Sequence, residues 1–286
     1  MKALILGCGY TGSHLARRLQ AQGVTVNITT QSGIAPAGVS AACFAFSCDS
    51  AGGKFPLTPE ALQGVTHVLT TIPPDRQGID PVVHCLLSDL ERLKLTWFGY
   101  LSTTGVYGDT HGAWVDETTP TNPQHGRSRQ RVAAETSLLK ASLPTHIFRL
   151  PGIYGLGRNT FDRLRAGKAQ RIDRPGHVFS RVHVDDIVQT LWRSMQQPTP
   201  GEIYNICDDQ PSEASSLITE AAELLGIQPP DLIPFSQVQM SPMAASFWSE
   251  CRRVSNRKIK DKLGVQLLYP TYREGLREIR QQELAS

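Results

Sequence analysis

The 286-residue sequence has no apolar run near the roughly 18 residues that a membrane-spanning helix requires. Its first apolar stretch, residues 3–6, is also shorter than the hydrophobic region of a secretory signal peptide. The formal net charge is only +3, and so small an excess of positive charge does not indicate a nucleic-acid partner. We therefore expect a cytoplasmic protein that binds neither membranes nor nucleic acids.

The cysteines lack the spacing of a metal site or a redox motif. No C-x-x-C pair occurs among the six, which are Cys8, Cys43, Cys48, Cys85, Cys207 and Cys251. Disulfides are rare in cytosolic proteins. We therefore expect reduced thiols that pack as small hydrophobic side chains, and we expect no metal centre.

Three glycines near the N-terminus form the most informative motif that is present. Residues 7–12 match G-x-G-x-x-G and lie between a strand-like run at 3–6 and a helical pattern at 13–22. In such a unit Gly7 allows a tight turn, Gly9 lets a pyrophosphate approach the backbone, and Gly12 lets the helix pack on the strand. The free amides at the helix start, at Tyr10 and Thr11, bind the anion. The motif predicts NAD or NADP as the cofactor.

Strand-like apolar runs alternate with helical patterns along the first 150 residues. The predicted strands are 3–6, 24–28, 42–46, 67–72, 97–101 and 146–150, and the predicted helices are 13–22, 58–63, 81–95 and 132–143. This order predicts an α/β fold of the Rossmann type, a doubly wound parallel sheet with helices on both faces. Ligands of such sheets bind at the carboxyl ends of the strands.

The second predicted strand ends without the acidic residue that binds the ribose 2′-hydroxyl of NAD in many such proteins. Thr30 and Gln31 stand there instead, and both side chains can hydrogen-bond a hydroxyl or a 2′-phosphate. The missing acid favours NADP slightly, but no arginine is present to hold its phosphate, so both coenzymes stay open. Asp49, shortly after the third predicted strand, and Thr71 and Ile72, the last residues of the fourth, are further candidate coenzyme contacts.

Residues 101–109, Leu-Ser-Thr-Thr-Gly-Val-Tyr-Gly-Asp, follow the fifth predicted strand directly. This run resembles one in the extended short-chain dehydrogenase/reductase family, the NAD(P)-dependent epimerases and dehydratases of nucleotide sugars. The likeness recurs in order at residues 115–120, 149–158, 182–188, 203–206, 253–256 and 263–264. It implies hydride transfer on a nucleotide sugar or a related small molecule. By the same likeness Thr103 matches the hydroxyl that hydrogen-bonds the reacting oxygen of the substrate, with Ser102 as the alternative.

One motif of that family is missing. Its members carry Y-x-x-x-K downstream of V-Y-G, where the tyrosine exchanges a proton with the substrate and the lysine lowers the pKa of that tyrosine. Here His125 stands at the place of the tyrosine and Arg129 at that of the lysine. Residues four apart share one helix face, and histidine is an acid or a base near neutral pH. His125 and Arg129 are therefore candidate catalytic residues, and a surface histidine at a helix start is the alternative.

The C-terminal part is expected to form a smaller substrate-binding cap. In the family, basic residues of the cap hold the pyrophosphate of the nucleotide sugar, so the resemblance points to Arg158 and Arg253. The predicted nucleotide-binding domain comprises residues 1–157 and 176–207, and the predicted cap comprises residues 158–175 and 208–286.

Residues 183–188 contain a histidine and two aspartates, but no further ligand stands at a spacing that suits a metal. The resemblance implies instead that an aspartate caps a helix there. Family members often pair through a helix bundle, which implies a homodimer.

Two functions fit the sequence. The first is an NAD(P)-dependent epimerase, dehydratase or reductase in which an unusual group moves the proton. The second is a catalytically impaired NAD(P)-binding sensor or scaffold protein, because the glycines are kept while the tyrosine is lost.

Overall fold

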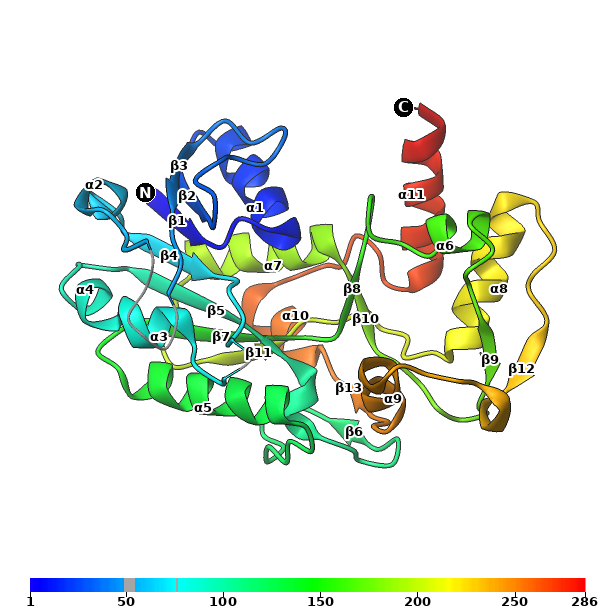
Figure 1. The fold of residues 1–286 in the computed structure, drawn as a ribbon. Coiled ribbons are helices and arrows are strands. Elements are labelled where there is room, and N and C mark those ends of the chain that lie inside the picture. Colours follow the sequence, from blue (N-terminus) through cyan, green and yellow to red (C-terminus); the bar gives the residue numbers. More distant parts are fainter. Residues whose placement is uncertain (49–54, 76, 286) are drawn as a thin grey trace.

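A seven-stranded parallel sheet forms the centre of the computed structural model, which describes residues 1–48, 55–75 and 77–285 (Figure 1). The strand order is β11-β7-β5-β4-β1-β2-β3, and all neighbours pair in parallel. The strands are β1 (Lys2–Leu6), β2 (Thr25–Thr30), β3 (Ala42–Ala45), β4 (His67–Thr70), β5 (Trp97–Thr103), β7 (Thr145–Leu150) and β11 (Ile203–Asn205). From β1 the chain adds β2 and β3 on one side, and it then crosses over to add β4, β5, β7 and β11 on the other side. This order confirms the predicted Rossmann-type fold.

Helices cover both faces of this sheet because side chains along each strand alternate between two buried layers. Ile5 of β1 packs with one set of helices, and its neighbours Leu4 and Leu6 pack with the other. The first set is α1 (Tyr10–Ala21), α7 (Val184–Gln196) and α10 (Arg257–Leu263), and the second is α3 (Pro81–Cys85), α4 (Leu87–Glu91) and α5 (Gly126–Lys140); the short α2 (Pro59–Leu62) precedes β4. In the described ranges, no helix combines the length and apolar character that crossing a membrane demands.

The C-terminal elements build a second layer beside the sheet, on the right of Figure 1. Here α6 (Phe161–Arg165), α8 (Ala214–Leu225) and α11 (Tyr272–Ala285) enclose a separate core that includes Phe161, Tyr272 and Leu276. Burying each of these side chains contributes about 1.5–3 kcal/mol. We call these helices, together with β9 (Arg171–Asp173), β12 (Leu232–Pro234), η2 (Phe235–Gln237) and α9 (Pro242–Trp248), the cap.

Three two-stranded parallel sheets lie in the described part of the chain. In one of them, β9 pairs with β12 inside the cap. The other two join β8 (Gly152–Tyr154) to β10 (Arg181–His183) and β6 (Trp114–Val115) to β13 (Arg253–Val254). The last pair brings the C-terminal segment back to the chain that follows β5.

Two of the predicted helices differ from the structure by more than three residues at one end. The helix predicted at 81–95 is two short helices, α3 and α4, which end at Glu91. The backbone leaves helical geometry at Leu86 (φ −122°), while Leu86 itself stays buried. The helix predicted at 132–143 begins six residues earlier, at Gly126. Its first two turns are polar, so they carry no apolar periodicity that would reveal them in the sequence.

A disulfide joins Cys48 to Cys85, with Cα atoms 6.3 Å apart, so the expectation of reduced thiols is wrong for this pair. The fold brings the segment after β3 to the end of α3, a proximity that a sequence separation of 37 residues does not reveal. The other four cysteines are free, as expected, and Cys8 and Cys207 among them are buried.

The helix start near His183 is capped differently from the expectation. His183, not an aspartate, is the N-cap of α7, and its Nδ1 accepts a hydrogen bond from the amide of Asp185 at 3.3 Å. Asp186 is buried and accepts hydrogen bonds from the amides of Leu268 (2.7 Å) and Tyr269 (3.1 Å). Asp186 therefore holds the segment after α10 in place, and the cap of α7 is His183.

Candidate active site

A cleft of about 1200 Å³ opens at the carboxyl ends of the central strands, between the sheet and the cap. Its sheet side includes residues 9–11 at the start of α1, Thr71 after β4 and residues 101–104 at the end of β5. Its other side comes from β8, α6, α9 and the segment after α9. This is the position at which doubly wound sheets bind their ligands.

Hydrogen bonds from two neighbouring segments fix the backbone of the glycine turn between β1 and α1. Gly7 adopts φ +83°, a conformation that favours glycine. Its amide donates to Thr29 Oγ1 (2.9 Å), and its carbonyl accepts from Thr71 Oγ1 (2.5 Å). A Cβ on Gly12 would lie 3.0 Å from the Gly7 carbonyl oxygen and 3.2 Å from Ile5 Cγ2, so the third glycine permits the close packing of α1 on β1.

The start of α1 leaves its first amides available to a ligand. A Cβ on Gly9 would meet nothing within 4 Å, and no described side chain caps the helix. The first backbone bond into the helix runs from Ser13 N to Gly9 O (2.8 Å), so the amides of Tyr10 and Thr11 precede the bonded ladder and line the cleft. This arrangement fits a coenzyme pyrophosphate, whose negative charge the helix N-terminus stabilises.

The remaining predicted coenzyme contacts occupy different places. Thr71 lines the cleft, and Ile72 packs against Gly7, where its Cγ1 would lie 2.7 Å from an added Cβ. Thr30 and Gln31 lie at the end of β2 outside the cleft, and Thr30 Oγ1 donates to the carbonyl of Ile34 (3.2 Å). Asp49 lies outside the described residues.

Two hydroxyls at the end of β5 line the cleft, and they differ in what holds them. Ser102 Oγ donates to Glu135 Oε1 (2.5 Å), and Glu135 pairs with Arg149 (2.7 Å) where both side chains are only 4% exposed. The hydroxyl hydrogen of Ser102 is therefore already used in a hydrogen bond to the buried Glu135–Arg149 ion pair. Thr103 Oγ1 accepts from Gly105 N (3.1 Å) at the start of η1 (Thr104–Tyr107), which leaves its own hydrogen available to a ligand.

Two arginines of α5 face the cleft, and Arg129 does not. Arg131 Nη1 donates to the hydroxyl of Tyr100 (2.9 Å) and to the carbonyl of Leu101 (2.8 Å), and Arg127 lines the cleft one turn earlier. Arg129 is exposed, and its Nη1 donates to the carbonyl of Gln124 (2.9 Å). The α5 arginines that line the cleft near the end of β5 are therefore those at 127 and 131. They are four residues apart, as are the predicted catalytic residues His125 and Arg129.

The sequence contained a signal for Arg131 that was missed. The buried positions of α5 are Ser128, Ala134, Glu135 and Leu138. Continuing this face by three or four residues from Glu135 leads to Arg131. The predicted helix began only at residue 132, so the residues before it were not assigned to a face.

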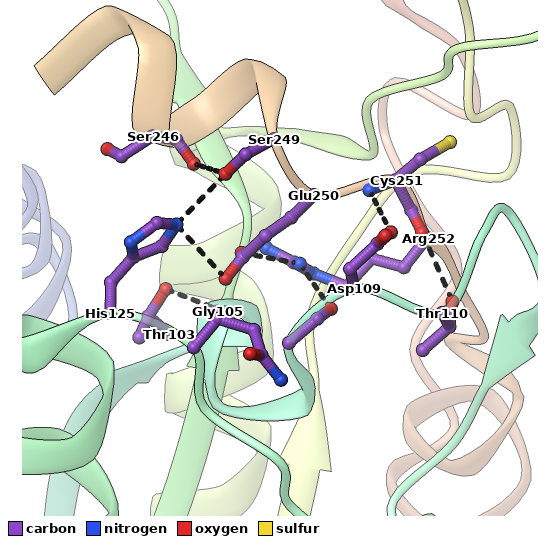
Figure 2. A network of polar contacts seen from close by, with 12 residues as sticks. Thr103, Gly105, Asp109, Thr110, His125, Ser246, Ser249, Glu250, Cys251 and Arg252 are labelled. Carbon is purple, nitrogen blue, oxygen red and sulfur yellow. Dashed lines mark hydrogen bonds and ion pairs between the residues drawn. The ribbon is translucent and has the colours of Figure 1, made fainter. Parts of the chain in front are cut away.

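His125 lies at the N-cap of α5 and contacts the segment after α9 (Figure 2). Its Nε2 is 3.0 Å from Ser249 Oγ and 3.5 Å from Glu250 Oε1. Its side chain is 29% exposed, and His125 is not among the residues that line the cleft, whereas Glu250 is. The structure thus brings Thr103 and Ser102 into the lining of the cleft and leaves His125 outside it, in contact with Glu250.

The cleft is strongly basic. Six arginines and two carboxylates line it: Arg127, Arg131, Arg158, Arg163, Arg181 and Arg252, with Asp162 and Glu250. Arg158 lies over the ring of Tyr10 (5.7 Å), at the α1 end. Arg253 lies outside the cleft, where it donates to the carbonyl of Gly112, and its neighbour Arg252 takes the cleft position. This charge favours an anionic ligand.

The two tyrosines nearest the end of β5 are held in structural hydrogen bonds. Tyr100 donates to Asp80 Oδ2 (3.0 Å), and Tyr107 donates to Asn205 Oδ1 (2.8 Å). Burial raises the pKa of both phenols. Within the described ranges, no three His, Cys, Asp or Glu side chains are arranged to hold a metal ion.

Comparison with known proteins finds a family model and several similar chains. The model of the NAD dependent epimerase/dehydratase family matches residues 82–207. Protein YeeZ of Escherichia coli K12 is 32% identical over 248 residues, which cover 80% of this chain and 85% of YeeZ. A functionally unknown conserved protein from Silicibacter pomeroyi DSS is 43% identical, with 98% of each chain covered and a TM-score of 0.89. MoeE5, solved in complex with UDP-glucose and NAD, shares the fold at 19% identity, covering 99% of this chain and 100% of its own, with a TM-score of 0.73.

Proposed function

We propose that the chain is an NAD(P)-dependent oxidoreductase that acts on a carbinol of a nucleotide sugar or a related small molecule. The chain belongs to the NAD-dependent epimerase/dehydratase family. The observation that carries this proposal is that Thr103 Oγ1 and the uncapped start of α1 line the same cleft. One end of the cleft suits a coenzyme pyrophosphate, and the other offers a hydrogen-bond donor to a reacting oxygen.

The chain's own groups supply the binding and the polarisation. The amides of Tyr10 and Thr11 bind the pyrophosphate, and a bound nicotinamide coenzyme supplies hydride acceptance and donation. Thr103 donates its hydroxyl hydrogen to the substrate oxygen as negative charge develops there. Ser102 acts through Glu135 to hold the end of β5 in place.

The substrate class follows from the charge of the cleft. Six arginines against two carboxylates suit a ligand that carries a diphosphate. MoeE5, which has the same fold, was solved with UDP-glucose and NAD. We propose that Arg158 and Arg252 contact the anionic part of the substrate.

The coenzyme and the active site are tested on the purified protein. NADH and NADPH are titrated by fluorescence against the wild type, Thr103→Ala and the matched control Thr103→Ser. UDP-, GDP- and dTDP-sugars are then incubated with coenzyme and analysed by chromatography. We expect Thr103→Ala to lower turnover by about 10²-fold with unchanged coenzyme affinity, and the serine variant to retain turnover. Coenzyme binding no tighter than millimolar would reject the coenzyme, and full turnover in Thr103→Ala would reject the active site.

The domain division, the assembly and the location are proposals of the same kind. We propose that the predicted substrate-binding part, residues 158–175 and 208–286, supplies the substrate contacts, except for α10, which packs on the central sheet. We also propose that the chain forms a cytoplasmic homodimer, as family resemblance implies. Size-exclusion chromatography with light scattering tests the dimer. A monomer across the micromolar range would contradict it.

A further inference from the structure

Glu250 lines the cleft and carries a buried carboxylate oxygen that has no hydrogen-bond partner among the described residues. The residue follows α9, is 7% exposed, and lines the cleft. Its Oε2 accepts from Arg252 Nη1 at 2.7 Å. Its Oε1 has no hydrogen-bond partner among the described residues. Buried polar atoms in folded proteins are nearly always hydrogen-bonded, so this oxygen is an acceptor that a ligand can satisfy with a hydrogen-bond donor.

The position of Glu250 is fixed by its neighbours (Figure 2). Arg252 Nη1 also donates to the carbonyl of Gly108 (2.7 Å), which ties the Glu250–Arg252 pair to the loop after η1. The amide of Cys251 donates to Asp109 Oδ1 (2.8 Å), so the backbone of this segment is held to the same loop. This loop follows η1, which begins directly after Thr103. Glu250 is therefore held to the segment that carries the candidate active-site hydroxyl.

His125 contacts Glu250 and Ser249 but is not among the described residues that line the cleft. Its Nε2 lies 3.5 Å from Glu250 Oε1, a contact without hydrogen-bond geometry, and 3.0 Å from Ser249 Oγ. The side chain of His125 is 29% exposed, compared with 6% for Glu250. The two groups therefore form a short path from the cleft to solvent.

We propose that Glu250 Oε1 accepts the proton of the reacting substrate hydroxyl and that His125 passes this proton to solvent. The inference rests on the proposed function and names the group that replaces the family's tyrosine. When a carbinol is oxidised, its carbon loses a hydride to the oxidised nicotinamide, its oxygen loses a proton, and a C=O bond forms. The O–H bond breaks toward Glu250 Oε1, which becomes O–H, and reduction runs the same path in reverse. Glu250 is the catalytic residue in this scheme, and His125 acts through it.

Binding provides the first test, because it does not require turnover. Each UDP-, GDP- or dTDP-sugar is titrated calorimetrically beside its free nucleoside diphosphate, in the presence of NADH or NADPH. Glu250→Gln keeps the shape and one acceptor for Arg252, but it places an amide where Oε1 stands. Asp109→Asn is the matched control, since that carboxylate holds the same segment and lies outside the cleft.

We expect the wild type and Asp109→Asn to bind one nucleotide sugar more tightly than its free diphosphate. Glu250→Gln should lose about tenfold to a hundredfold of the sugar affinity, the value of a hydrogen bond to a charged acceptor, and keep the affinity for the diphosphate. Sugar affinity in Glu250→Gln equal to the wild type would overturn the inference. Failure of the wild type to bind any nucleotide sugar, with coenzyme still bound, would overturn the proposed substrate class instead.

The role of His125 is tested on the nucleotide sugar that the wild type converts. His125→Ala should lower turnover at least tenfold without weakening sugar binding, and added imidazole should restore turnover by accepting the proton in its place. A merely structural histidine would not give this rescue. Unchanged turnover in His125→Ala, or a loss that imidazole does not restore, would overturn the proton path.

Discussion

Replacing Gly9 with alanine separates coenzyme binding from folding. The backbone of Gly9 (φ −83°, ψ −152°) accepts an alanine, and the new Cβ would meet nothing within 4 Å. We therefore expect the free energy of unfolding to change by less than about 1 kcal/mol, since removing a glycine mainly restricts the unfolded chain. The same methyl group enters the cleft beside the amides of Tyr10 and Thr11. Losing one hydrogen bond to a charged phosphate corresponds to about tenfold to a hundredfold weaker binding.

The assay pairs urea unfolding with NADH and NADPH fluorescence titration. Gly126→Ala is the matched control, because its Cβ would also meet nothing within 4 Å and Gly126 is exposed at the start of α5, outside the cleft. The control should keep both stability and affinity. If Gly9→Ala binds coenzyme as tightly as the wild type, the turn does not hold the pyrophosphate and the proposed function loses its basis.

The buried ion pair, the disulfide and one buried acid each predict a change in stability. Glu135→Gln leaves the Arg149 guanidinium without its partner and should cost about 3–5 kcal/mol in urea unfolding; a loss under 1 kcal/mol would contradict this. Reducing Cys48–Cys85 should cost about 4 kcal/mol for a loop of this length, and thermal unfolding of Cys48→Ser should not respond to dithiothreitol. Burial raises the pKa of Asp208 from 3.8 to about 8 in the folded protein. Between pH 3.8 and pH 8 the folded state therefore binds a proton that the unfolded state has lost. The free energy of unfolding then falls as pH rises, by up to about 1.4 kcal/mol per pH unit. Asp208→Asn should flatten this slope in urea unfolding at pH 6 and pH 8, and an unchanged slope would refute the assignment.

The sheet and the glycine turn were predictable because their physical requirements are local. Strands buried on both faces must be apolar along their whole length, so runs such as residues 3–6 and 146–150 stand out in the sequence. The turn requires glycine at three fixed places for three separate reasons, of which the positive φ of Gly7 and the tight packing at Gly12 are visible in the structure. Both signals depend on neighbours within about a dozen residues.

The parts that escaped prediction depend on contacts between distant segments. Cys48 meets Cys85 only after the sheet has formed, and spacing alone does not encode that contact. Glu250 reaches the cleft because β13 pairs with β6, which returns the C-terminal segment to the loop after β5. A pairing of two residues on each strand leaves no periodic pattern in the sequence.

The chemistry of the cleft also narrows where a proton acceptor can be. Three residues of α5 line the cleft, Arg127, Gln130 and Arg131. A guanidinium stays protonated at any working pH, and the amide of Gln130 does not take up a proton in this range. Tyr10 and Tyr154 line the cleft, but burial raises the pKa of both phenols, the opposite of what an acceptor requires. No histidine is among the described residues that line it, and of its two carboxylates Asp162 is 67% exposed and paired with Arg165. Glu250 is left as the buried group with an acceptor atom to spare, so an intact coenzyme turn and a missing tyrosine are compatible with a working enzyme.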